Sequence, residues 1–161
     1  MFGRAAAHRA VETVQAGGTT RSAPQAATDK ALERFDRMRH ADGNVPAAQI
    51  RHDMQQVMQR HAAVFRSSAS LTEGVANMDN VASQMGQIGV KDKSLIWNTD
   101  LIEAMELENL VGQALVTIRS ADQRAESRGA HAHEDWPERD DEHCNTHTVM
   151  WLDEQTRSTV G

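Results

Sequence analysis

Apolar side chains recur every three or four residues through most of the chain, the spacing that places them on one face of an α-helix. The longest such run extends from Asp100 to Ala125, and its apolar positions are Ala104, Leu107, Val111, Ala114, Ile118, Ala121 and Ala125. We expect Asp100 to cap the start of this helix and Gly129 to take the positive φ of the turn that follows it. Because no other stretch is as long or as regular, the remaining helices are expected to pack against it.

The same spacing predicts four shorter helices. The first is Phe2–Val14, and the second extends from Thr28, its predicted cap, to Ala41. The third begins at Pro46, and its apolar face carries Ile50, Met54, Val57, His61 and Val64. The fourth begins at the capping-box pattern Ser70-Leu71-Thr72-Glu73. A Gly-Gly-Thr-Thr segment after the first helix indicates a flexible linker. Short connections between the later helices favour antiparallel neighbours. The middle of the chain is therefore predicted to be an antiparallel bundle of three to four helices.

The helical pattern disappears after His131. Residues 126–147 hold seven acids, two arginines and four histidines without periodicity, which predicts an irregular surface segment. Thr148–Leu152 has the composition of a short strand, although no partner strand is evident in the sequence. The predicted fold class is mainly α: a helical bundle with an irregular tail and one short C-terminal strand.

Composition narrows the function classes. The chain has 161 residues, a formal net charge of −6 and one cysteine, Cys144. The negative charge argues against a nucleic-acid partner, and a single cysteine excludes an internal disulfide. No run of 18 apolar residues and no apolar signal-peptide core occur, so we expect no direct membrane insertion.

Two clusters offer candidate chemistry. The first cluster has side chains that commonly bind zinc: His131, His133, His143, Cys144 and His147. Their spacing fits no standard zinc pattern, so no metal site is predicted. A small zinc-binding protein is kept as an alternative. The second cluster is Asp140, Asp141 and Glu142, which could supply the paired carboxylates of a hydrolase. An acidic run without a regular pattern is, however, more typical of a solvated loop. His61 lies on an apolar stripe and is expected to be a core histidine. No glycine-rich phosphate loop or nucleophile elbow is present.

Five segments resemble a known family. They are Phe2–Ala6, His61–Arg66, Trp97–Glu103, Glu126–His131 and Glu134–Asp141, and His147-Thr148 and Trp151 follow in the same order. With these motifs the chain resembles the flavoprotein subunit of succinate dehydrogenase and its fumarate reductase relatives. One departure is the His143–Thr148 segment, which stands where the family usually has a tryptophan and a lysine before the His-Thr pair. Loss of that aromatic is expected to weaken packing of the tail.

The resemblance implies a domain organisation and a parent reaction. Residues 1–16 would be the last helix of a truncated FAD-binding domain, 17–27 a linker, 28–127 the C-terminal helical bundle, and 128–161 the start of a tail that packs on the parent subunit. The parent enzyme oxidises succinate to fumarate with FAD, in the tricarboxylic acid cycle, and passes electrons to an iron–sulfur subunit and quinone. Such a complex lies at the cytoplasmic face of the bacterial inner membrane or the matrix side of the mitochondrial one.

No catalytic residue and no FAD-binding residue of the family has a counterpart in this chain, because the family's flavin and dicarboxylate motifs lie upstream of Phe2. We therefore expect FAD in the parent subunit and none on this chain alone. Residues expected to help dock the bundle on the FAD-binding domain are Arg4, Glu126, Arg128, Gly129 and His131. Arg128 is expected to present its guanidinium to a carboxylate or to backbone carbonyls. The alternative is a stand-alone helical interaction module without enzymatic activity.

Overall fold

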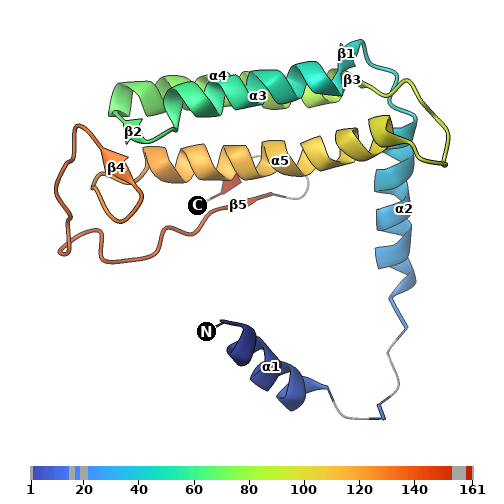
Figure 1. The fold of residues 1–161 in the computed structure, drawn as a ribbon, viewed down its shortest axis with the longest axis horizontal. Helices are drawn as coiled ribbons and strands as arrows, with labels where there is room; N and C mark the ends of the chain where they lie inside the picture. Colours follow the sequence, from blue (N-terminus) through green and yellow to red (C-terminus); the bar gives the residue numbers. More distant parts are fainter. Residues whose placement is uncertain (1, 15–16, 19–21, 154–158, 161) are drawn as a thin grey trace. The chain divides into compact units, whose positions relative to one another are not determined.

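The chain is mainly helical, as predicted (Figure 1). The computed structural model describes residues 2–14, 17–18, 22–153 and 159–160. Its α-helices are α1 (Phe2–Thr13), α2 (Gln25–Arg39), α3 (Ala47–His61), α4 (Ser68–Gln84) and α5 (Thr99–Asp122), and a short 3₁₀ turn, η1 (Met85–Gln87), follows α4. Parts of the predicted linker 17–27 and of the tail after Asp153 lie outside the described residues. The chain divides into two compact units, residues 1–34 and 35–161.

The first unit contains α1 and the beginning of α2. Every described side chain of α1 is exposed, and Arg4 on this helix donates from Nε to Nε2 of His8 at 3.4 Å. The prediction that Thr28 caps the second helix is wrong. That helix begins at Gln25, where the Pro24 carbonyl accepts from the Ala27 amide at 3.0 Å, because proline can start a helical turn without needing its own N–H.

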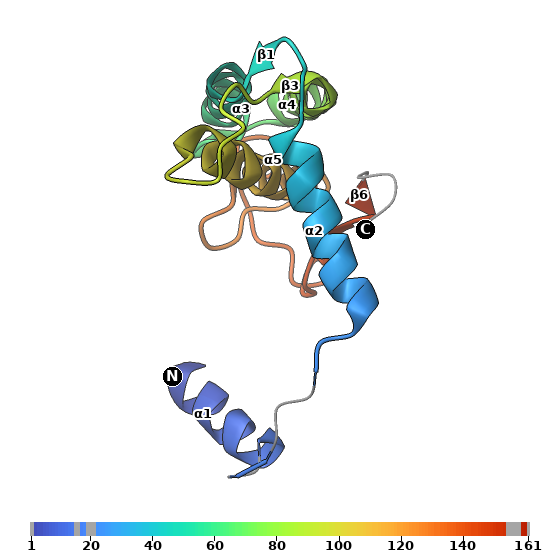
Figure 2. The same ribbon diagram turned by 90° about the vertical axis from the view of Figure 1, so that its right-hand side faces the viewer.

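The second unit is built on three helices that lie side by side, α3, α4 and α5 (Figures 1 and 2). The predicted stripe of α5 is buried from Ala104 to Ala121, whereas Ala125 is exposed because the helix ends at Asp122. His61 is buried, as expected, and its Nδ1 lies 3.2 Å from the Ser70 hydroxyl. The remaining apolar core residues of this unit include Met38, Ile50, Met54, Leu71, Met78, Val81, Leu101 and Leu115.

Two predicted helix starts are displaced by one turn or less. Ser67, not Ser70, caps α4 by accepting the Ser70 amide at 3.3 Å. Asn98, not Asp100, caps α5, and its Oδ1 accepts the Leu101 amide at 2.9 Å. Asp100 instead accepts the Lys91 amide at 2.7 Å, so its carboxylate fixes the preceding loop. In both places a nearby polar residue outside the helix, rather than the predicted one, accepts the hydrogen bond from an amide of the first helical turn.

Short strand pairs tie the ends of the helices together. β1 (Val45–Pro46) runs parallel to β3 (Ile88–Gly89), and β2 (Phe65–Arg66) runs parallel to β4 (Ala132–His133). The expected C-terminal strand is shorter than predicted, because β5 covers only Trp151–Leu152. Its partner, missed in the sequence, is β6 (Thr159–Val160), which pairs with it in antiparallel register. In the described part of the chain, no helix is both long enough and apolar enough to cross a membrane.

Candidate functional site

Glu126 is the centre of a buried ion-pair cluster at the corner where α5 leads into the tail. Its side chain is 0% exposed, and its Oε1 accepts from Nε of Arg124 and from Nε of Arg128, both at 2.8 Å. The other oxygen, Oε2, accepts the Asp140 amide at 2.9 Å. The Arg128 hydrogen bond, aided by the Asp140 amide and Arg124 and opposed by burial, lowers the pKa of Glu126 to about 2. The carboxylate is therefore charged at any physiological pH.

Arg128 extends the cluster to the surface. Its Nη2 donates to Oδ1 of Asp141 at 2.7 Å and to the Asp140 carbonyl at 3.2 Å. The expectation that this guanidinium binds a carboxylate and a carbonyl is met, but both partners belong to the same chain. The Glu126 hydrogen bond, followed by the Asp141 hydrogen bond, raises the pKa of Arg128 above its already high value. Arg128 thus holds the Asp140–Asp141 segment against the corner.

A tight turn completes this corner. The main chains of Arg128 and His131 exchange hydrogen bonds of 2.9 and 3.0 Å, and Gly129 between them has φ +59°. The positive φ predicted for Gly129 is confirmed, although the glycine lies beyond the helix end rather than at it. A Cβ at Gly129 would meet open space, so backbone conformation alone accounts for glycine there.

His131 is held in one neutral form by its two neighbours. Its Nδ1 accepts from Nη1 of Arg66 at 2.8 Å, and its Nε2 donates to the Arg124 carbonyl at 3.1 Å. A guanidinium can only donate and a carbonyl can only accept, so the geometry requires a proton on Nε2 and none on Nδ1. Burial, and to a smaller extent the positive charge of Arg66, lowers the pKa of His131, while the Arg124 carbonyl opposes the shift.

This arrangement predicts a loss of stability on mild acidification. Since the pKa of His131 is lower in the folded chain than the ordinary value of 6.5, the unfolded chain binds the proton more readily. The stabilising contribution is complete above pH 6.5 and is lost as the pH falls through the folded pKa. The melting temperature of each protein is expected to fall when the pH is lowered from 7 to 5. For a His131→Gln variant we expect this fall to be roughly 3 °C smaller than for the wild type.

The matched control is His52→Gln, which removes an exposed histidine of α3. Thermal unfolding followed by circular dichroism at both pH values measures the difference. Equal pH dependence of the wild type and His131→Gln would show that this histidine is not held neutral.

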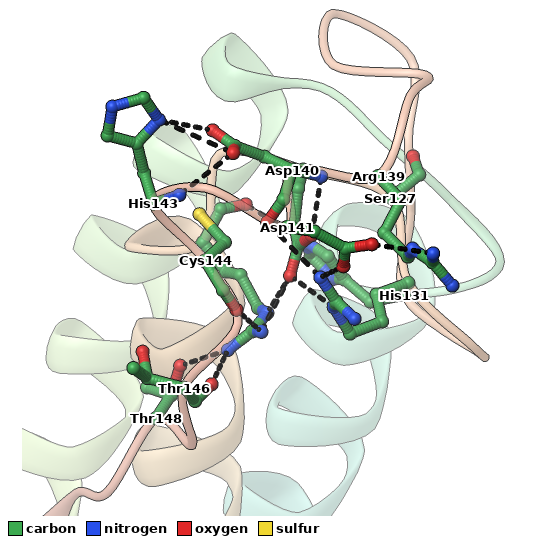
Figure 3. Close-up of polar contacts among 12 residues, drawn as sticks. Ser127, His131, Arg139, Asp140, Asp141, His143, Cys144, Thr146 and Thr148 are labelled. Atoms are coloured by element: carbon green, nitrogen blue, oxygen red, sulfur yellow. Dashed lines mark hydrogen bonds and ion pairs between the residues drawn. The ribbon is translucent and has the colours of Figure 1, made fainter.

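Arg124 holds the irregular tail to the end of α5 and was missed as a site residue. Its guanidinium donates to the carbonyl of Cys144 at 2.6 Å, the carbonyl of Thr146 at 3.1 Å and Oγ1 of Thr148 at 2.8 Å. Figure 3 shows these three tail residues beside the corner. Ser127 makes a second attachment, because its Oγ accepts the His133 amide and donates to the Trp136 carbonyl, both at 2.8 Å.

A cavity of about 690 Å³ lies between the C-terminal half of α5 and the tail. The residues that line it include Arg66, Arg124, Arg128 and His131 and the tail segment Cys144–Thr148. The tail segment is the one that departs from the family pattern. The cavity therefore lies where packing of the tail was expected to be weak.

The other candidate clusters have structural roles. His143 hydrogen-bonds to Asp140, and His131 lies edge-on to His133 with ring centroids 5.9 Å apart. Within residues 2–14, 17–18, 22–153 and 159–160, no group of three or more histidine, cysteine or acidic side chains is placed to hold a metal ion. Asp140 accepts the amides of Glu142 and His143, and Asp141 pairs with two arginines. These contacts of Asp140 and Asp141 tie the tail together.

Comparison with known proteins gives a consistent set of relatives. The family described as fumarate reductase flavoprotein C-term matches residues 51–160. The succinate dehydrogenase flavoprotein subunit of Rickettsia conorii is 47% identical over 96% of this chain and 26% of its own length. The mitochondrial succinate dehydrogenase [ubiquinone] flavoprotein subunit of Oryza sativa is 43% identical over 98% of the chain and 25% of its own length.

Solved structures give the same result. An E. coli quinol fumarate reductase chain superposes on 99% of this chain and 28% of its own length, with a TM-score of 0.88 and 28% identity. The chain thus spans about a quarter of the length of the relatives that it matches.

Proposed function

The chain belongs to the succinate dehydrogenase and fumarate reductase family of flavoprotein subunits, and we propose that it acts as the C-terminal helical domain of a subunit that oxidises succinate to fumarate. The match of 47% identity to a succinate dehydrogenase subunit over nearly the whole chain carries this proposal. In the complete subunit, electrons from succinate pass to FAD, then to an iron–sulfur subunit and quinone. Peripheral attachment to the cytoplasmic face of the bacterial inner membrane, or to the mitochondrial matrix side, follows from that assembly.

We propose that FAD is not bound by the described residues of this chain, and the starts of α4 and α5 support this. A dinucleotide cofactor needs a helix N-terminus with free amides to bind its phosphates. At the start of α4 the Ser68 amide already donates to the Asp135 carboxylate at 2.7 Å, and at the start of α5 the Leu101 amide donates to Asn98. We therefore assign FAD to the part of the subunit that lies outside this chain and derive no catalytic step from the residues present.

The contribution of this chain is structural. The bundle provides a rigid body, and the corner from Glu126 to His131 fixes the course of the tail. We propose that the corner also faces the FAD-binding domain. Glu126, Arg128 and His131 use their polar groups within the chain, which supports an indirect role for them in shaping the contact. Gly129, exposed at the tip of the turn, is then a direct contact, and Arg4 of α1 is a second docking residue.

Assay of the purified chain tests the first part of the proposal. We expect a folded helical protein that copurifies with no flavin and gives no succinate-dependent reduction of an electron-accepting dye. A flavin absorbance spectrum together with succinate oxidation would contradict it, because all the chemistry would then reside in this quarter of the subunit.

The oligomeric state of the purified chain in solution distinguishes a domain of a larger subunit from a stand-alone interaction module. The second unit exposes several large apolar side chains, among them Leu95, Ile96, Trp97 and Ile102. A domain that normally packs on a larger body is expected to self-associate through such residues, whereas a stand-alone module is expected to be monomeric. Sedimentation of the chain over a range of concentrations distinguishes the two.

A further inference from the structure

Arg66 lies in the wall of the cavity between α5 and the tail, and among the described residues it has no charged partner. Its Nε donates to the Ala63 carbonyl at 3.0 Å, its Nη2 to the Ala62 carbonyl at 3.1 Å and its Nη1 to His131 at 2.8 Å. All three acceptors are neutral, and no carboxylate among the described residues forms an ion pair with this guanidinium. Two of its five N–H groups remain available, since three are used.

The other charges around the cavity do not neutralise Arg66. Arg124 and Arg128 also line it, and both of them bind the single buried carboxylate of Glu126. Asp141 pairs with Arg128 and with Arg139. The cavity wall therefore carries an excess of positive charge in a chain whose formal net charge is −6. A half-buried guanidinium in such a place is stabilised when an anion replaces the water lost on burial.

The cavity also has suitable size and hydrogen-bonding groups. Its volume of about 690 Å³ leaves ample room for a group of a few heavy atoms. Thr117 of α5 and Thr148 of the tail line it with hydroxyl groups, which can donate to anionic oxygens. Ser120 of α5 also lines it, although its hydroxyl donates to Sδ of Met150 at 3.9 Å. Val116 and Ala121 complete the wall with apolar surface.

We propose that this cavity binds a small oxyanion, a phosphate or carboxylate group, through the guanidinium of Arg66. The site is separate from the succinate chemistry assigned to the rest of the subunit and does not depend on the proposed function. The bound anion pairs with Arg66, and because the Cys144–Thr148 segment also lines the cavity, it stabilises the tail against α5.

Isothermal titration calorimetry of the full chain with inorganic phosphate, and separately with acetate, tests the proposal at constant ionic strength. We expect saturable binding of at least one of these anions at a single site, and a melting temperature about 3 °C higher in its presence. The anion that binds identifies the class. Absence of saturable binding for both anions would overturn the proposal.

Two variants locate the site. Arg66→Gln removes the charge and is expected to weaken binding at least tenfold. Cys144→Trp keeps every charge but places an indole at the cavity lining, where it takes up part of the space, so it is also expected to weaken binding. This variant tests the proposal if Arg66→Gln does not fold. Arg51→Gln, which removes an arginine that pairs with Glu106 on the surface, is the control and is expected to bind like the wild type. Undiminished binding by Cys144→Trp, or an equal loss in Arg51→Gln, would place the anion elsewhere and refute the proposal.

Discussion

A Glu126→Gln variant is expected to melt roughly 10 °C below the wild type at pH 7, because it removes the one carboxylate that two guanidinium groups share in a fully buried place. Glutamine keeps the size of the side chain, but its charge is lost and its amide group adds donors where Arg124 and Arg128 already donate. The single amide oxygen of glutamine can accept either from the two arginines or from the Asp140 amide, so one side is left facing an N–H group. Thermal unfolding followed by circular dichroism measures the effect.

The pH dependence of that variant gives a second readout. Because the pKa of Glu126 falls to about 2 on folding from an ordinary value of 4.5, its stabilising contribution is complete above pH 4.5 and is lost as the pH falls towards 2. The difference in melting temperature between the wild type and Glu126→Gln is therefore constant from pH 5 to 7 and shrinks at lower pH.

Glu106→Gln is the matched control. Glu106 lies on the exposed face of α5 with a single partner, Arg51, so its replacement is expected to change the melting temperature by about 2 °C or less. If Glu126→Gln proved no more harmful than Glu106→Gln, the buried cluster would not be what holds the corner together.

A Gly74→Ala variant is expected to lose about 1 kcal/mol of unfolding free energy. Gly74 lies buried in α4, where an added Cβ would approach Cβ of His61 to 2.5 Å and Cδ1 of Ile118 to 2.7 Å. These neighbours belong to α3 and α5, so the methyl group would force the three helices apart. Overpacking of this kind costs about 1–3 kcal/mol, which outweighs the gain of about 0.5–1 kcal/mol from alanine in a helix.

Gly86→Ala provides the comparison, because a Cβ at Gly86 in the 3₁₀ turn η1 meets nothing within 4 Å. We expect this change to leave stability the same or slightly higher. Urea denaturation of both variants measures the free energies. A Gly74→Ala protein as stable as Gly86→Ala would mean that the bundle is packed more loosely at this level than the structure indicates.

The helical part of the fold could be predicted because its signal is local. The stripe from Ala104 to Ala121 follows the 3.6-residue period, and these residues form the buried face of α5. Glu108 breaks the pattern, since it is buried yet charged. Its Oε1 accepts from Nη2 of Arg37 at 2.9 Å. Because Arg37 lies 71 positions earlier in the chain, no local sequence pattern predicts this pair.

The site was only partly predictable for the same reason. Glu126, Arg128, Gly129 and His131 were named from the family resemblance of their segment as docking residues, and that role stays a prediction. Arg124 and Arg66 were not, because what makes them important is contact with residues 20 or more positions away. The strands β2 and β4 were also not predicted, because a strand of two residues is too short to show the alternation of apolar and polar side chains.

The most direct test of the central claim is to replace the C-terminal quarter of the Rickettsia conorii flavoprotein subunit with this chain and to measure bound flavin and succinate oxidation. If the chain is the helical domain of such a subunit, the hybrid is expected to keep its flavin and to oxidise succinate within about tenfold of the native rate, whereas the same subunit truncated before this domain is not. A hybrid that folds but is as inactive and flavin-poor as the truncated subunit would contradict the claim.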